Sequence, residues 1–162
     1  MEQSNTAQPI EDLRRILGEK FGDLQSLYSR QIHGGRLLYP PTSETVVDEA
    51  EEDLGFPLPA LLRAIYTRIG NGGLALWLMG LDGGQRSELT FNQRTIVEAY
   101  RACVGFGRGE DGREPWPQRL VPIYDGLGCG MVDYVDCNTL GGVIWRMVVS
   151  PFSGRPALEK MP

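Results

Sequence analysis

The sequence predicts an α+β fold, in which a mainly antiparallel sheet near the C-terminus carries helices packed on one of its faces. Two observations lead to this fold class. Apolar residues recur at helical period within the stretch 44–73, and strand-like segments separated by glycine-containing turns fill the last third of the chain. With 162 residues the chain is long enough for one domain with a core, so we expect a single domain over residues 1–162.

Two segments precede the stretch 44–73. Residues 9–28 carry apolar side chains at helical spacing and predict an N-terminal helical extension, which Gly18 and Gly22 weaken and can divide into two pieces. Residues 29–42 contain a glycine pair and a proline pair, which is typical of a connector. Within it, Leu37 to Tyr39 form either a short strand or an anchor to the core.

The stretch 44–73 itself predicts two helices joined by a proline corner. Ser43 is placed to cap the first helix, and Gly55 is placed to end it because glycine adopts the left-handed conformation without strain. Pro59 suits the first turn of the second helix, which the glycines after Ile69 would end. The apolar stripes consist of Val46, Val47, Ala50 and Leu54 in the first helix and of Leu61, Leu62, Ile65, Tyr66 and Ile69 in the second.

Between the helix pair and the last third, the sequence predicts one strand, one helix and one long loop. Residues 74–81 form a near-continuous apolar run between glycine pairs, which predicts a buried strand with Trp77 in its middle. Thr90 is expected to cap a helix over about residues 92–104. Residues 105–119 are rich in glycine, proline and charge, and they predict a loop long enough to carry a function.

The last third predicts a β-meander, because short β-prone segments alternate with turn residues. Pro151, Gly154 and Pro156 are then expected to end regular structure before a polar tail. The predicted strands are residues 120–124, 128–136 and 143–149, with turns at 125–126 and 138–142.

An ordered set of motifs accompanies these elements, consisting of Glu51-x-x-Leu54-Gly55, Leu58-Pro59 and Asn71-Gly72-Gly73. This set resembles the opening motif of the SUKH superfamily, which contains yeast cell-wall assembly regulators and bacterial immunity proteins of polymorphic toxin systems. The resemblance implies that the motif residues are structural.

The second half of the chain is similar to one common bacterial branch of the same superfamily. The resemblance covers about residues 39–149, so the expected core spans about residues 39–150. Gly126-Leu127 departs from the pattern, because an aromatic residue is expected before that glycine. The matching residues are Trp116-Pro117, Leu120, Pro122-Ile123, Asp125, Gly128-Cys129, Val135-Asp136-Cys137 and Gly142-Val143.

Charge and hydropathy narrow the classes of partner. Sixteen basic residues against 21 acidic ones give a net charge of −5, which argues against general nucleic-acid binding and leaves open a cationic protein partner. No apolar run approaches the ~20 residues of a membrane span, and the N-terminus lacks the pattern of a signal peptide. Three cysteines without a CxxC pattern do not indicate a disulfide framework. We expect a cytoplasmic protein that binds neither nucleic acid nor membrane.

The sequence offers little for catalysis, cofactors or metals. Glycines in 105–109 and 126–130 are spaced as in nucleotide loops, but such a site needs a strand before the glycines and a helix after them. The first set follows a predicted helix and runs into prolines, and the second lies between predicted strands. His33 is the single histidine, so a zinc site or a nucleophilic triad would depend on it alone. Cys129 and Cys137 lie on one predicted strand, roughly 26 Å apart at ~3.3 Å per residue, which is too far for a disulfide. We therefore expect no enzyme, no cofactor and no metal site.

Acidic side chains on the first helix of the pair are the first candidate binding residues. Asp48, Glu49 and Glu52 could face a cationic partner, and the alternative is an ordinary solvated helix face. Glu51 could instead be structural, accepting hydrogen bonds from amides at the following corner.

The loop 105–119 supplies the second group of candidate binding residues. Glu110 and Asp111 could block a basic active site of a partner. Trp116 is either an exposed aromatic anchor, a residue type enriched in binding hot spots, or a loop side chain packed onto the sheet.

The resemblance implies a non-enzymatic, cytoplasmic bacterial protein that binds and neutralises a cognate toxin domain, often a nuclease. A scaffold or regulator like the yeast branch is the second hypothesis, and it differs in its partner rather than in its chemistry. The third is a small hydrolase that uses Asp125 or Asp136, although Asp125 can also close its own turn through a bond to backbone. A regular strand would place Asp133 and Asp136 on opposite faces, so these two do not form a catalytic pair.

Overall fold

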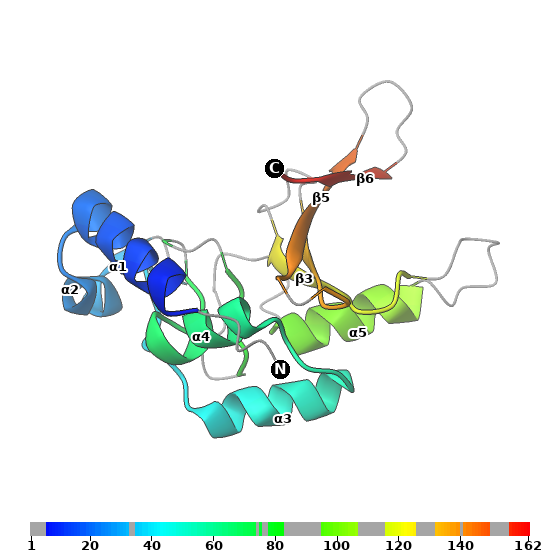
Figure 1. Cartoon of the computed structure of the whole chain (residues 1–162), viewed down its shortest axis with the longest axis horizontal. Helices are drawn as coiled ribbons and strands as arrows, with labels where there is room; N and C mark the ends of the chain where they lie inside the picture. The colour runs from blue at the N-terminus through cyan, green and yellow to red at the C-terminus, as the bar shows by residue number, and fades with distance from the viewer. Residues whose placement is uncertain are drawn as a thin grey trace.

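The computed structural model describes residues 6–32, 35–73, 75, 78–82, 95–106, 116–125, 132–139, 141–149 and 156–162. Within these ranges the chain is α+β, with helices first and an antiparallel sheet after them (Figure 1). The helices are α1 (Ala7–Phe21), α2 (Leu24–Ser29), α3 (Glu44–Leu54), α4 (Ala60–Arg68) and α5 (Ile96–Phe106), and the strands are β1 (Gln31–Ile32), β2 (Gly35–Arg36), β3 (Leu120–Asp125), β4 (Val132–Asp136), β5 (Val143–Val149) and β6 (Pro156–Lys160).

The larger sheet has the strand order β3-β4-β5-β6, and every neighbouring pair is antiparallel. Val135 lies near its centre, opposite Val121 of β3 and Ile144 of β5. The meander prediction is therefore confirmed, and the bounds of β5 are those the sequence predicts. Predicted strand residues 128–131, which include Cys129, lie outside the described part of the chain.

The expectation that regular structure ends by Pro156 is wrong. This residue begins β6, where it lies opposite Val149 and pairs antiparallel with β5. Proline is tolerated at the first residue of an edge strand, because its missing N–H is not needed by the ladder. Pro151 and Gly154 lie outside the described residues, and a further strand follows them.

The α3–α4 pair forms as the sequence predicts. The hydroxyl of Ser43 accepts a hydrogen bond from the amide of Val46 at 3.3 Å and so caps the first turn of α3. Gly55 has φ 81° and ψ 14°, the left-handed conformation that ends a helix readily only with glycine. Pro59 is the N-cap residue of α4, which begins at Ala60. At this position the proline ring removes no hydrogen bond of the helix.

The prediction of a buried strand over residues 74–81 is wrong for the part described. Instead of lying in a strand, Gly73 and Leu78 form an isolated antiparallel bridge with each other, with hydrogen bonds of 2.9 and 3.3 Å. Leu78 and Leu81 are still buried, which explains the apolar run, since such a run reports burial rather than backbone conformation. Trp77 lies outside the described residues.

Helix α5 begins at Ile96, later than the predicted start at residue 92. The reason is a capping box: the amide of Thr95 donates to the Glu98 carboxylate at 2.9 Å, and the Glu98 amide donates to the Thr95 hydroxyl at 3.2 Å. This reciprocal pair fixes a helix start at the following residue. The predicted cap Thr90 lies outside the described residues.

Helix α1 packs against α4, and α2 packs against α1, on the side of the molecule away from α5 (Figure 1). The predicted extension does divide in two, and Gly22, with φ 89°, separates α1 from α2. Ile10 and Leu17 of α1 are buried in one cluster with Ile69 after α4. Leu38 of the connector is fully buried, so the connector is anchored to the core. Before Leu38, the two-residue strands β1 and β2 pair with each other antiparallel.

The main core lies between α3, α4 and α5 and the sheet, with the helices below the strands in the view of Figure 1. Val47 of α3, Tyr66 of α4 and Val121 of β3 are fully buried within it. The Tyr66 hydroxyl donates to the Met79 carbonyl oxygen at 2.7 Å, which gives this polar group a partner inside the apolar cluster. This core holds the outer faces of α3 and α5 in fixed positions.

Candidate functional site

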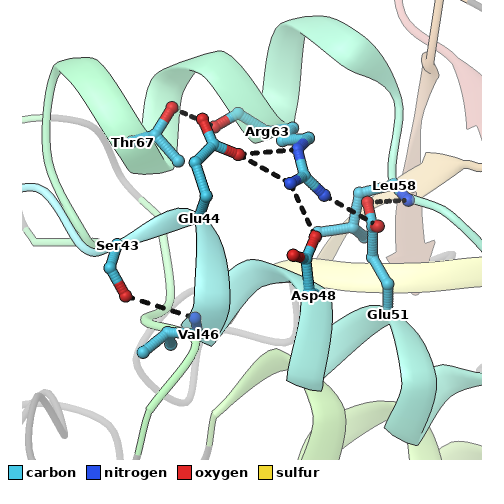
Figure 2. Close-up of polar contacts among 8 residues, drawn as sticks. All are labelled: Ser43, Glu44, Val46, Asp48, Glu51, Leu58, Arg63 and Thr67. Atoms are coloured by element: carbon cyan, nitrogen blue, oxygen red, sulfur yellow. Dashed lines mark hydrogen bonds and ion pairs between the residues drawn. The ribbon is translucent and has the colours of Figure 1, made fainter.

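The corner between α3 and α4 is held by one carboxylate. Glu51 accepts a hydrogen bond from the Leu58 amide at 2.9 Å with one oxygen, and its other oxygen lies 2.9 Å from Nη1 of Arg63 (Figure 2). Leu58 is buried, so its amide depends on this acceptor for a partner. Glu51 therefore acts within the fold, as the structural alternative from the sequence describes.

Arg63 gathers two further carboxylates of α3. Its guanidinium lies 2.6 Å from Glu44 and 2.6 Å from Asp48, and Figure 2 shows all three acidic side chains converging on it. The hydrogen bond with Asp48 is the main reason that the pKa of Arg63 is raised above its ordinary value. The charge of Asp48, a candidate binding residue in the sequence, is therefore partly compensated by Arg63, although its side chain is exposed.

The remaining acidic residues of α3 point to solvent. Glu49 and Glu52 are exposed, and no ion pair or hydrogen bond engages either carboxylate within the part of the chain that the structure describes. Asp53 at the end of the helix pairs with Arg101 of α5 at 2.8 Å. Of the three acidic residues of α3 that the sequence singles out, Glu49 and Glu52 thus keep an uncompensated charge.

Trp116 lies at the start of the chain that leads into β3, and it is half-buried. Its indole N–H donates to the Leu120 carbonyl oxygen at 2.9 Å, and its ring centroid is 5.2 Å from that of Tyr134 in β4. The structure therefore places this tryptophan against the sheet, the second of the two alternatives from the sequence. Glu110 and Asp111 lie outside the described residues.

The Asn71-Gly72-Gly73 segment packs tightly against residues 37–39 of the connector and against residues 78–81. Asn71 is 1% exposed, and its side-chain oxygen accepts a hydrogen bond from the Leu81 amide at 2.8 Å. Gly72 and Gly73 have φ values of 86° and 125°, which side-chain-bearing residues rarely adopt. These contacts connect the end of α4 to the loop that follows it.

The acidic residues of the meander do not converge on one point. Asp136 accepts a bond from the Asn138 amide at 2.9 Å, within the β4–β5 turn. Asp133 pairs with Arg146 of β5 through two contacts of 2.6 and 2.8 Å, which are the main reason that the pKa of Arg146 is raised. Asp125 ends β3, and its side chain lies outside the described part. Asp133 and Asp136 thus both have structural partners.

Two hollows lie on the described surface, and they differ in chemistry. One, of about 320 Å³, lies between α1, α4 and the sheet and is lined by apolar side chains such as Leu13, Ile65 and Ile144. The other, of about 290 Å³, lies between α3 and α5 and is lined by both apolar and charged residues. Only the second brings together groups able to make directional polar contacts with a ligand.

Groups suited to catalysis or metal binding are sparse among the described residues. No cluster of three His, Cys, Asp or Glu side chains is arranged there to hold a metal ion. Burial raises the pKa of the Cys137 thiol to about 12, which makes it a poor nucleophile near neutral pH. None of the helices described is long and apolar enough to cross a membrane.

Sequence reasoning missed two residues that organise this region. Arg63 carries no motif, because its role depends on how α3 and α4 meet in space. Arg146 could have been found, since it follows Asp133 on the adjacent predicted strand and cross-strand opposite charges attract.

Comparison with known proteins agrees with this architecture. No curated protein sequence matches the chain significantly. A family profile does match, over residues 41–155, from just before α3 to just before β6, which is more than half of the chain. The matched region contains the α3–α4 corner with Glu51, the Asn71-Gly72-Gly73 segment and the strands β3, β4 and β5. The chain therefore belongs to the SMI1/KNR4 family, SUKH-1.

Proposed function

We propose that this chain is a non-enzymatic binding protein of the bacterial cytoplasm, which neutralises a cationic toxin domain by covering it. Family membership supports a binding role, and the resemblance of its motifs to toxin-immunity proteins supports this particular one. A nuclease is the toxin class that fits best, because its active site is basic in order to hold phosphates.

The observation that carries the proposal is the uncompensated acidic face of α3. Glu49 and Glu52 are exposed and without ion pairs among the described residues, whereas Asp48 beside them is held by Arg63. With a net charge of −5 over the whole chain, this face attracts a cationic partner at long range. Glu110 and Asp111, which lie outside the described residues, remain in the proposal as further acidic contacts, and Trp116, half-buried against the sheet, remains as a contact through its exposed part.

The engagement of the other carboxylates favours binding over catalysis. Glu51 accepts the Leu58 amide, Asp133 pairs with Arg146 and Asp136 closes a turn. Each of these carboxylates is therefore engaged in a structural contact and is not available as a catalytic acid or base. Cell-wall regulation, the alternative role in the same superfamily, needs the same kind of surface with a different partner. The partner therefore decides between the two roles.

The test is capture of the tagged protein from its native lysate, followed by identification of the partner and a toxicity assay. We expect one stoichiometric basic toxin domain, whose toxicity in a heterologous host is abolished when this chain is co-expressed. A housekeeping or cell-envelope partner, or co-expression that leaves the toxicity unchanged, would contradict the immunity role.

Matched charge reversals then test the face itself. The double variant Glu49→Lys, Glu52→Lys should weaken binding of the captured domain by more than tenfold at low salt, and the loss should shrink as salt rises. The control, Glu11→Lys with Glu19→Lys, makes the same change of net charge on exposed positions of α1. Equal losses for the two double variants would mean that only net charge matters and that α3 is not the contact surface.

A further inference from the structure

The hollow between α3 and α5, here called the α3–α5 pocket, has the composition of a site for one amphipathic cationic side chain. The two helices lie side by side (Figure 1), and the space between them measures about 290 Å³. At ~30 Å³ per water it has room for several water molecules or for one long side chain. Apolar walls come from Val46 of α3, Leu81 of the loop and Val97 of α5.

The charge of this pocket is strongly negative. Its lining contains four carboxylates, those of Glu49, Asp53, Asp82 and Glu98, against the one guanidinium of Arg101. Asp53 is paired with this guanidinium, and Glu98 accepts the Thr95 amide in the helix cap. The pocket therefore keeps two carboxylates, Glu49 and Asp82, without an ion pair among the described residues.

Asp82 supplies an observation that is independent of the charge count. Its Oδ1 atom is buried and finds no hydrogen-bond partner in the described structure. A buried carboxylate oxygen without a donor is unfavourable, and native proteins rarely leave one in this state without a functional reason. Since Oδ1 is closed to solvent, a cation bound in the pocket would contact Asp82 through its other oxygen, Oδ2, and would balance a carboxylate that has no donor among the described residues.

We propose that the α3–α5 pocket receives an arginine side chain of the partner protein, with Asp82 as its main acceptor. A guanidinium has five N–H donors in a planar fork, so it can bond to Asp82 and still face Glu49 at the exposed rim. Its methylene stem would pack along Val46, Leu81 and Val97, as arginine stems do on apolar surface. Lysine fits less well, because its ammonium is more strongly hydrated and harder to desolvate.

This inference rests on the proposed function for the origin of the arginine, but its test does not need the toxin. The probe is the peptide acetyl-Gly-Arg-Gly-amide, titrated into the isotope-labelled full-length protein while backbone amide shifts are recorded by NMR. We expect saturable shift changes at Leu81, Asp82 and Val97, and at least tenfold weaker binding of the matching lysine peptide. No shift changes near the pocket, or equal binding of the two peptides, would overturn the proposal.

Variants then assign the acceptor. Asp82→Asn preserves the shape of the side chain and should weaken the arginine peptide at least tenfold. Glu49→Gln changes only an exposed residue, so it should leave folding intact and weaken the peptide about threefold. Glu19→Gln on α1 is the matched loss of one charge outside the pocket, and it should bind as the parent protein does. If Asp82→Asn or Glu49→Gln, each folded by circular dichroism, binds like Glu19→Gln, the pocket assignment is wrong.

The two proposals fail in different ways. Peptide binding that depends on Asp82, in a protein whose captured partner is not a toxin, keeps the pocket and refutes immunity. A captured toxin whose affinity is the same for Asp82→Asn as for the parent keeps immunity and refutes the pocket.

Discussion

Replacing Glu51 should show how much the α3–α4 corner depends on a single carboxylate. The side chain joins the Leu58 amide on one oxygen and Arg63 on the other, each at 2.9 Å. Glu51→Ala removes both interactions. Glu51→Gln keeps a side-chain oxygen for the Leu58 amide but removes the charge that attracts Arg63. Comparison of the two variants therefore separates the amide bond from the ion pair.

The magnitudes follow from burial. Leu58 is 6% exposed, so a Leu58 amide without an acceptor costs about 1–3 kcal/mol of the free energy of unfolding. The side chains of Arg63 and Glu51 are 28% and 17% exposed, and their pair adds about 1 kcal/mol after allowance for solvent screening. We expect Glu51→Ala to destabilise the protein by about 2–4 kcal/mol and Glu51→Gln by about 1 kcal/mol.

The measurement is urea unfolding followed by circular dichroism, with stability compared at constant slope. Glu52→Ala is the matched control, because it removes an exposed carboxylate from the same helix and should change stability by less than about 0.5 kcal/mol. Glu44→Ala, which loses an ion pair from a side chain that is 62% exposed, should cost no more than about 1 kcal/mol. The reasoning is refuted if Glu51→Gln costs as much as Glu51→Ala, or if Glu44→Ala costs more than either.

Two further predictions concern backbone and thiol chemistry. Gly72→Ala should destabilise the protein by about 2 kcal/mol or more, because φ is 86° there and a Cβ would lie 2.8 Å from backbone atoms. Gly18→Ala, inside α1 with open space around it, should instead be neutral or stabilising by up to about 1 kcal/mol, as thermal melts of the two variants would show. With the other cysteines changed to serine, Cys137 in the folded protein should react with iodoacetamide at pH 8 about a thousandfold more slowly than an ordinary thiol, because burial raises its pKa from 9.0 to about 12. Fast labelling at pH 8 would contradict this burial. The contribution of the neutral thiol to the free energy of unfolding is present below pH 9 and should fall as pH rises from 9 towards 12.

The sequence predicts the helix pair and the meander well because local signals determine them. Ser43 and Gly55 mark the ends of α3 through backbone geometry that depends on the residue itself. The strand predicted after Gly73 is wrong, because an apolar run indicates that Leu78 and Leu81 are buried but does not determine the backbone conformation.

The candidate site is harder to predict than the fold for a physical reason. Whether Asp48 or Glu49 is available to a partner depends on where the guanidinium of Arg63 lies, and that position is set by the crossing of two helices. The same holds for Asp82, whose role depends on the packing of α3 against α5. Charge is readable from sequence, but its compensation by a neighbouring element is a property of the tertiary structure.

The strand β6 has a consequence for how the family segment behaves on its own. The matched region ends at residue 155, one position before Pro156 begins β6. A protein truncated there would leave β5 as a bare sheet edge, open to edge-to-edge pairing between molecules and hence to aggregation. A start at residue 41 would in turn remove Ile10 and Leu17 from their contacts with Ile69. The segment that the family profile matches is thus smaller than the packed structure, in which β6 covers the edge of β5 and α1 covers Ile69.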